Sequence, residues 1–311
     1  MSRAGSLEGL LSDRIASQGP MPFAAFMQLA LYHPQFGYYA AGRPRTGWAG
    51  DFVTSPELDP AFGQLWASGF EQIWKACGSP HRFEVVEVGP GEGSFAEAVL
   101  ESAAGGFADA LAYRLVERQP AVQKRQRMRL DRFPHVRWSD SIVDVAPVEY
   151  GAVFANEVLD NLPVHLVERA GSTLHEVCVT ERDGTLAFEL LPPSSPELER
   201  FLERSGATLP EGHRMEVSLA AESFVGRAAR VGRGAVVLVD YGDEGLQLAQ
   251  LPRGSLVCYS PAGADDDPLA APGHKDITTH VNWTAVRAAG RRAGLEMAGP
   301  VAQREVLLAL G

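Results

Sequence analysis

Cysteine and long apolar segments are both scarce in this 311-residue sequence. The three cysteines, Cys77, Cys178 and Cys258, lie far apart and outside any CxxC pair, which argues against a disulfide framework and against a zinc site. No segment approaches the roughly 20 consecutive apolar residues of a membrane span. Glu8 and Asp13 interrupt the beginning of the chain, where a signal or transit peptide would carry no acidic residues. We therefore expect a cytoplasmic protein with no membrane partner.

Positive charge is also in short supply. The 28 lysines and arginines are outnumbered by 39 acidic residues, which gives a net charge of −11. Proteins that hold a phosphate backbone need a basic surface, so nucleic acid is a disfavoured substrate. The eight histidines show no metal-binding spacing, and the sequence has neither a P-loop nor a nucleophile elbow. These absences argue against a metal site, a kinase and a hydrolase.

From residue 83 onward, apolar runs alternate with segments of helical periodicity. We expect strands at 83–88, 113–116, 136–138, 152–155 and 235–239, and helices at 95–102 and 120–130. Alternating strands and helices are typical of βαβ units and a parallel sheet. The predicted fold class is therefore α/β, with a Rossmann-like sheet.

Other segments predict additions to this core. Residues 7–32 read as two helices broken at Gly19-Pro20, and residues 54–57 as a capping box ahead of a helix at 60–76. Three short runs separated by turn signals, at 165–168, 174–180 and 186–190, predict a β-meander inserted into the sheet order. Residues 194–232 look helical, and the chain is expected to end with a helix at 283–293 and a strand at 306–310.

These patterns suggest four segments. Residues 1–80 form an N-terminal helical extension with a loop that covers the cofactor. Residues 81–164 form a Rossmann-like core, residues 165–232 an inserted meander and helical region that contacts substrate or acts as a lid, and residues 233–311 complete the core sheet.

The most specific local signal is a glycine-rich turn after the first expected strand. Glu87 is followed by Gly89, Gly91 and Gly93 at alternate positions. Glycine lets the backbone adopt positive φ and lie against a ligand. A dinucleotide fingerprint needs G-x-G-x-x-G, whereas Ser94 follows Gly93 here, so the spacing favours S-adenosylmethionine. A carboxylate such as Glu87 or Glu92 would suit the positive charge of the sulfonium. The alternative is that the three glycines only form a tight strand-to-helix turn that binds no ligand.

Polar residues also follow the next two expected strands. Glu117 comes after the second strand, where such folds place an acid that accepts from the ribose hydroxyls. Asp140 follows the third strand and is a candidate for the adenine amino group, with Ser141 beside it. An exposed strand end and an ordinary Ser-Asp-Ser turn explain the same residues without a cofactor.

The end of the fourth expected strand supplies the candidate acceptor site. Asn156, Glu157 and Asp160 place one amide and two carboxylates at the carboxyl edge of the sheet, where open α/β proteins bind ligands. Two acids beside a sulfonium suit a cationic guanidinium or amine held for in-line attack. They equally suit a helix cap. Asp240 and Tyr241, after the strand at 235–239, are candidates for substrate binding in the same cleft.

With these residues in view, the chain resembles the MidA family, the bacterial and mitochondrial methyltransferases that include an assembly factor of respiratory complex I. The likeness runs nearly from end to end and rests on ordered blocks: His33-Pro34 with Gly37-Tyr38-Tyr39, residues 50–57, the turn at 87–93, residues 156–165, Asp240-Tyr241-Gly242, Asp276-Ile277-Thr278 with Val281, and residues 303–311.

The resemblance implies a class I methyltransferase fold that binds S-adenosyl-L-methionine and releases S-adenosyl-L-homocysteine. For the mitochondrial relative it implies symmetric dimethylation of an arginine in a complex I subunit. It also places Thr54 and Ser55 beside the cofactor. Two departures are Glu92, where relatives often carry arginine, and the acidic run at 265–267.

Three functions remain open on this basis. The first is N-methylation of a protein arginine, the second O- or N-methylation of a small molecule in a pocket under a lid built from the N-terminal helices and residues 194–232. The third is a non-catalytic assembly or binding protein on a methyltransferase scaffold. A nicotinamide dehydrogenase is disfavoured by the glycine spacing. The sequence leaves the acceptor and the oligomeric state open, a homodimer included.

Overall fold

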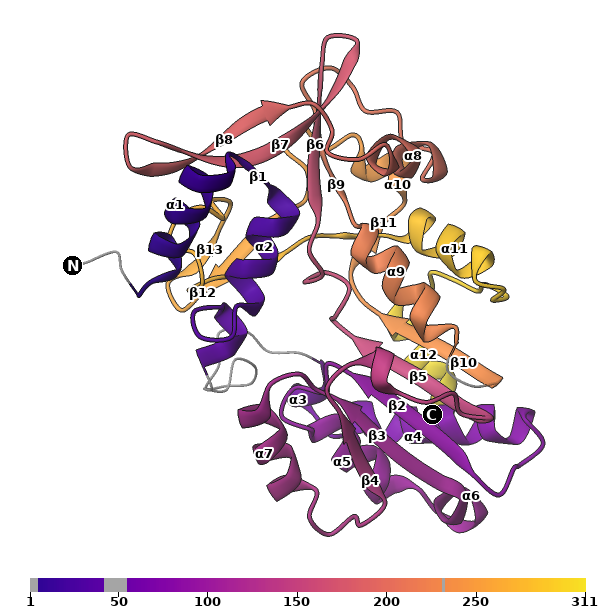
Figure 1. Cartoon of the computed structure of the whole chain (residues 1–311). Helices are drawn as coiled ribbons and strands as arrows, with labels where there is room; N and C mark the ends of the chain where they lie inside the picture. Colours follow the sequence, from indigo (N-terminus) through magenta and orange to yellow (C-terminus); the bar gives the residue numbers. More distant parts are fainter. Residues whose placement is uncertain (1–4, 42–54, 231–232) are drawn as a thin grey trace. The chain divides into compact units, whose positions relative to one another are not determined.

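The computed structural model describes residues 5–41, 55–230 and 233–311 (Figure 1). The chain divides into two compact units, and it passes from one to the other several times. The first unit comprises Met1–Ala41, Leu159–Phe224 and Tyr241–Arg292. The second comprises Gly42–Val158, Val225–Asp240 and Ala293–Gly311.

A five-stranded parallel sheet organises the second unit. Its order is β10-β5-β2-β3-β4 (Figure 1). The strand bounds are β2 (Phe83–Val88), β3 (Leu111–Val116), β4 (Val136–Ser139), β5 (Tyr150–Asn156) and β10 (Arg233–Val239). This arrangement confirms the Rossmann-like α/β class. All five predicted strands are present: β2 has the predicted bounds, and the other four are longer than predicted by one to three residues.

Helices and one apolar core support this sheet. The helices are α3 (Ser55–Leu58), α4 (Ala61–Ala76), α5 (Ser94–Ser102), α6 (Gly105–Ala110), α7 (Pro120–Arg129), η2 (Ile142–Asp144) and α12 (Gln303–Leu310). Phe70 of α4, Phe95 of α5 and Phe154 of β5 are almost completely buried together. The rings of Phe95 and Phe154 stack with their centroids 4.4 Å apart. Burial of such side chains contributes about 1.5 to 3 kcal/mol each, so this cluster fixes the sheet that presents the candidate site.

An antiparallel sheet organises the first unit. Its order is β1-β7-β6-β9, and β8 pairs with β7. The bounds are β1 (Met21–Pro22), β6 (His165–Ala170), β7 (Thr173–Arg182), β8 (Thr185–Leu191) and β9 (Arg214–Val217). Gly171 and Gly184 adopt positive φ at the two hairpin turns, as the turn signals predict. The β-meander is therefore confirmed, but it lies in a sheet of its own rather than within the parallel sheet.

The remaining elements of the first unit are short. The helices are α1 (Leu7–Gln18), α2 (Phe23–Tyr32), η1 (Tyr38–Ala41), α8 (Glu197–Arg204), α10 (Gly245–Leu248) and α11 (Trp283–Arg292). Two small sheets pair β11 (Gly242–Asp243) with β15 (Val281–Asn282), and β12 (Val257–Ser260) with β13 (Gly263–Asp265) and β14 (Asp276–Thr278). Helix α9 (Leu219–Ala228) begins in the residues of the first unit and ends in those of the second.

Local chemistry explains several of these boundaries. Helix α1 begins after Ser6, whose hydroxyl accepts from the N–H of Gly9 at 3.2 Å, and it ends at Gly19, where φ is +81°. Ser6 is a typical N-cap, and glycine tolerates the positive φ at the other end of the helix. Leu198, Phe201 and Leu202 of α8 follow helical spacing and are buried. They pack in one core with β6 and β9.

Two predicted elements are wrong. Residues 306–310 were expected as a strand but belong to helix α12, whose Leu310 packs against Gly69 of α4. A short apolar run does not distinguish a strand from a helix. Residues 194–232 were expected to be helical, yet β9 lies between α8 and α9 because it pairs with β6, a distant partner in the sequence.

Candidate functional site

Five candidate positions lie at one edge of the parallel sheet of the second unit. Parallel strands carry their carboxyl ends to the same edge. The glycine turn follows β2, Glu117 follows β3, Asp140 follows β4, Asn156 ends β5, and Asp240 follows β10. The structure therefore brings together the residues that the sequence assigned to a cofactor and to part of an acceptor site.

The glycine turn has the geometry that only glycine adopts readily. Gly89, Gly91 and Gly93 have φ values of +66°, +52° and +82°. Gly93 donates its N–H to the carbonyl of Pro90 at 2.9 Å and forms the N-cap of α5. A Cβ on Gly89 would lie 2.7 Å from Cγ2 of Val158. The turn thus offers close backbone approach, and the segment that follows β5 lies directly against it.

The Glu87 carboxyl, two residues before Gly89, is buried rather than open to solvent. It accepts a hydrogen bond from the Tyr113 hydroxyl at 2.8 Å. Burial raises the pKa of Glu87 to about 8, although the hydrogen bond from Tyr113 acts in the opposite direction. At neutral pH the carboxyl is therefore mostly protonated in this structure.

Glu92, the departure from the family pattern, is held by a neighbouring helix. Nε and Nη2 of Arg125 donate to its two carboxylate oxygens, both at 2.7 Å. Such a two-point contact neutralises the carboxylate and fixes its direction. Because Arg125 balances the negative charge of Glu92, Glu92 changes the electrostatic potential at the cofactor site less than the sequence suggests.

Helix α7 also contacts the candidate ribose and adenine residues. The Nε2 of Gln123 donates to the backbone carbonyl of Glu117 at 2.7 Å and to Oδ1 of Asp140 at 2.8 Å. Oε1 of Glu117 accepts from the N–H of Gln119 at 2.7 Å, and burial raises the pKa of this carboxyl. The Ser141 hydroxyl accepts from the N–H of Val143 at 3.3 Å and caps η2. Gln123 therefore links Glu117 to Asp140, and Ser141 caps the turn that follows, while its predicted contact with the cofactor stays a prediction.

Asn156 and Glu157 have unusual environments at the end of β5. Glu157 has φ of +51°, which is uncommon for a residue other than glycine. Its N–H donates to the carbonyl of Val239 at 2.8 Å, and Oε1 accepts from Nδ2 of Asn156 at 3.2 Å. Asn156 Oδ1 is buried and has no hydrogen-bond partner within the described part of the chain. Strain and an unsatisfied buried oxygen are both typical of ligand sites.

Asp240 stabilises the same corner, because its Oδ2 accepts from the N–H of Val158 at 3.2 Å. A positively charged or zwitterionic ligand would therefore meet an amide oxygen and two carboxylates at the ends of β5 and β10. A glycine cradle, an acid after β3 and this unsatisfied amide together fit the chemistry of S-adenosylmethionine.

Asp160 and Tyr241 belong to the first unit. The Tyr241 hydroxyl donates to Oδ2 of Asp160 at 2.7 Å. Desolvation raises the pKa of Asp160 to about 6, and the hydrogen bond from Tyr241 limits that rise. Nearby, Asp276 accepts from the Tyr39 hydroxyl at 2.9 Å and from Nδ2 of Asn161 at 3.0 Å. Glu157 and Asp160 are thus described in separate units, and their predicted joint role stays a prediction.

The two candidates ahead of the parallel sheet are only partly described. Thr54 lies outside the described residues, and so does the side chain of Ser55, whose backbone begins α3. Sequence reasoning missed Arg125 and Gln126 of α7. For Gln126 a signal exists, because Val122, Gln126 and Leu130 share one face at i, i+4 spacing.

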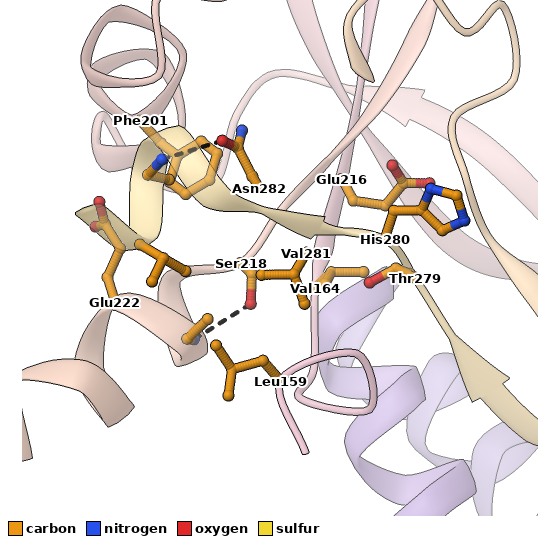
Figure 2. A pocket seen from close by; sticks show the side chains of 13 residues that line it. Leu159, Val164, Phe201, Glu216, Ser218, Glu222, Thr279, His280, Val281 and Asn282 are labelled. Atoms are coloured by element: carbon orange, nitrogen blue, oxygen red, sulfur yellow. Dashed lines mark hydrogen bonds between the residues drawn. The ribbon is translucent and has the colours of Figure 1, made fainter. Parts of the chain in front are cut away.

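A pocket in the first unit contains about 360 Å³ of empty space, part of it open to solvent. Figure 2 shows Leu159 and Phe201 on its walls together with Ser218, Glu222 and Asn282. The oxygens of Ser218 and Asn282 accept from backbone N–H groups three residues further on. Glu222 pairs with two arginines. Although residues from 194–232 line the pocket, α1 and α2 contribute none of the lining found in the described residues.

Among the residues that the structure describes, no three His, Cys, Asp or Glu side chains gather closely enough to hold a metal ion. No helix in that part of the chain is both long and apolar enough to cross a membrane.

Comparisons with known proteins agree with this geometry. The model of a family described as "Putative S-adenosyl-L-methionine-dependent methyltransferase" matches residues 65–301. The mitochondrial protein arginine methyltransferase NDUFAF7 homolog of Drosophila melanogaster is 31% identical, over 96% of this chain and 73% of its own length. The mouse protein of that name is 30% identical, over 97% of this chain and 73% of its own.

Two solved structures from Burkholderia thailandensis, both COG1565 superfamily members, are similar as well. One, bound to S-adenosyl-homocysteine, has a TM-score of 0.87 and 34% identity, and the match covers 98% of this chain and 80% of that one. The other, a native structure, has a TM-score of 0.83 and 33% identity over the same shares.

Proposed function

Because the chain belongs to this family of S-adenosyl-L-methionine-dependent methyltransferases, we propose that its methyl acceptor is an arginine side chain of a protein. The donor is S-adenosyl-L-methionine, whose sulfonium supplies an electrophilic methyl group when bound. The observation that carries the proposal is the 31% identity, over 96% of the chain, to a relative named as a protein arginine methyltransferase. The acidic character of the sheet edge supports it.

The residues of the second unit suit a cationic acceptor. A guanidinium needs carboxylates that bind its N–H groups and orient its nitrogen. The Glu157 carboxylate is held by Asn156, on a backbone whose N–H is bound to β10. Val158 lies against Gly89, so Glu157 directly precedes a residue that contacts the donor turn. We assign Glu157 the role of binding the guanidinium and accepting the proton that it releases.

Asp160 and Tyr241 are proposed as further acceptor residues. With its pKa near 6, Asp160 is mostly ionised at neutral pH and suits a cation. The Tyr241 hydroxyl holds its carboxylate in one direction. We also propose that the protein acts in the cytoplasm on a protein rather than a nucleic acid, in line with its net charge of −11. The curated relatives cited above are mitochondrial by name.

The test is methyl transfer to an arginine-containing peptide array, with lysine-substituted duplicates and mass spectrometry of the hydrolysed products. We expect methylarginine, and we expect Glu157→Gln to lower turnover by about 100-fold or more while calorimetry shows unchanged affinity for S-adenosyl-homocysteine. Asp183→Asn is a matched control, because Asp183 has the same φ of +51° in an exposed turn.

Different outcomes contradict different parts of the proposal. Methyl groups found on lysine, or on a small molecule but no peptide, would exclude an arginine acceptor. Full turnover in Glu157→Gln would leave arginine as the acceptor but remove Glu157 from its binding.

A further inference from the structure

Gln126 of α7 is a completely buried polar side chain, with 0% of its surface exposed. Burying an amide without hydrogen bonds is costly, yet both ends of this amide are satisfied. Its Nε2 donates to the carbonyl of Gly91 at 2.7 Å, and its Oε1 accepts from Nε1 of Trp138 at 3.0 Å. An indole N–H only donates and a carbonyl only accepts, so a single amide orientation satisfies both partners.

This contact fixes a peptide plane in the glycine turn. Gly91 lies in the left-handed region and is free to adopt many other conformations. In a trans peptide the carbonyl and the following N–H point in opposite directions. Because the Gly91 carbonyl points at Gln126 on α7, the N–H of Glu92 points away from that helix. Gln126 therefore determines which face of the turn presents a backbone donor.

The neighbouring residues of α7 act on the same turn and edge. Arg125 holds the Glu92 carboxylate through two hydrogen bonds. Gln123 donates to Glu117 and Asp140. One helix thus contacts the glycine turn and both acids that follow β3 and β4. Gln126 is the member of this set with no exposed surface, so no role at the protein surface accounts for it.

We propose that Gln126 is a positioning residue for the methyl donor: it acts through Gly91, whose peptide plane it sets for binding of the cofactor. The proposal rests on S-adenosylmethionine binding against the Gly89–Gly93 turn and is independent of the acceptor. The indole N–H of Trp138 sets the orientation of the Gln126 amide, so Trp138 contributes to the same positioning.

The experiment is calorimetric titration of S-adenosyl-homocysteine, with no acceptor present, at a temperature where every variant is folded. Gln126→Met keeps the unbranched shape of the side chain but removes both hydrogen bonds. We expect it to weaken binding by roughly tenfold, the equivalent of one hydrogen bond of about 1.4 kcal/mol. Trp138→Phe, which frees the amide to rotate, should weaken binding in the same direction by less.

The matched control separates positioning from general stability. Phe107→Leu lies in the same apolar core, on α6 just before the amino end of β3, and so at the edge opposite the turn. It should lower the melting temperature without changing the dissociation constant. Unchanged binding in both Gln126→Met and Trp138→Phe would overturn the proposal, as would equal weakening in Phe107→Leu. Should Gln126→Met fail to fold, Trp138→Phe decides the question alone.

Discussion

Replacement of Glu87 by glutamine should remove a large part of the pH dependence of stability. Glu87 is 4% exposed, and burial raises its pKa from the ordinary value of 4.5 to about 8. Below the lower value the carboxyl is protonated in the folded and the unfolded chain alike. Between the two values the unfolded chain loses the proton while the folded chain keeps it. Rising pH therefore favours the unfolded state throughout this window.

The magnitude follows from the width of the window. Each unit of pKa difference corresponds to about 1.4 kcal/mol, so the wild-type protein should lose roughly 3 kcal/mol through this one group between pH 5 and pH 8. Glutamine has no proton to lose, and its carbonyl still accepts from the Tyr113 hydroxyl. Glu87→Gln should accordingly have nearly the wild-type free energy of unfolding at pH 5 and a clearly higher one at pH 8.

Urea unfolding at several pH values from 5 to 9 measures this difference directly. Other buried acids contribute to the wild-type curve, but they are common to both proteins and cancel in the difference. Glu101→Gln, on the exposed side of α5, controls for loss of one surface charge. If the curves of wild type and Glu87→Gln run parallel over this range, the carboxyl is ionised in the folded protein and the reasoning from burial fails.

Two further changes test the site. Gly89→Ala places a Cβ at positive φ and 2.7 Å from Cγ2 of Val158. We expect its affinity for S-adenosyl-homocysteine to fall by about tenfold or more. The control Gly78→Ala is also at positive φ but has open space around it, so it should only lower the melting temperature. Tyr241→Phe removes the hydrogen bond that limits the rise in the pKa of Asp160, so the acidic limb of the pH profile of the methyl-transfer rate should move to higher pH. Tyr259→Phe, at an exposed tyrosine, is the control. If the acidic limb does not move, ionisation of Asp160 does not govern the rate.

The parallel sheet and its glycine turn were predictable because their signals are local. Strand β5 is an apolar run that ends at Asn156, and β2 is mainly apolar, with Glu84 and Glu87 as its polar residues. In both strands a polar residue at or next to the last position marks the carboxyl end. The glycines follow β2 without a gap, so one short stretch of sequence specifies strand, turn and helix start. Comparisons confirm the cofactor that this pattern predicts.

The errors share a physical cause, which is that distant partners decide between local alternatives. Residues 306–310 have the apolar content of a strand, but Leu310 packs on α4, and the segment is a helix. Residues 214–217 became β9 because β6 is available to pair with them. Neither partner is visible within a window of sequence.

The acceptor residues that we propose in the first unit are harder to predict from sequence than the donor site. Asp160 and Asn161 follow β5 in sequence, Tyr39 comes from the N-terminal segment, and Asp276 begins β14. Hydrogen bonds join Tyr39 and Asn161 to the same carboxylate, and Tyr241 binds the other acid. Four separate segments therefore build this network, and its geometry exists only after folding. Because each buried acid must remain hydrogen-bonded, a change in one segment alters the charge presented by another. Under the acceptor role that we propose for Asp160, acceptor choice can then change without altering the glycine turn.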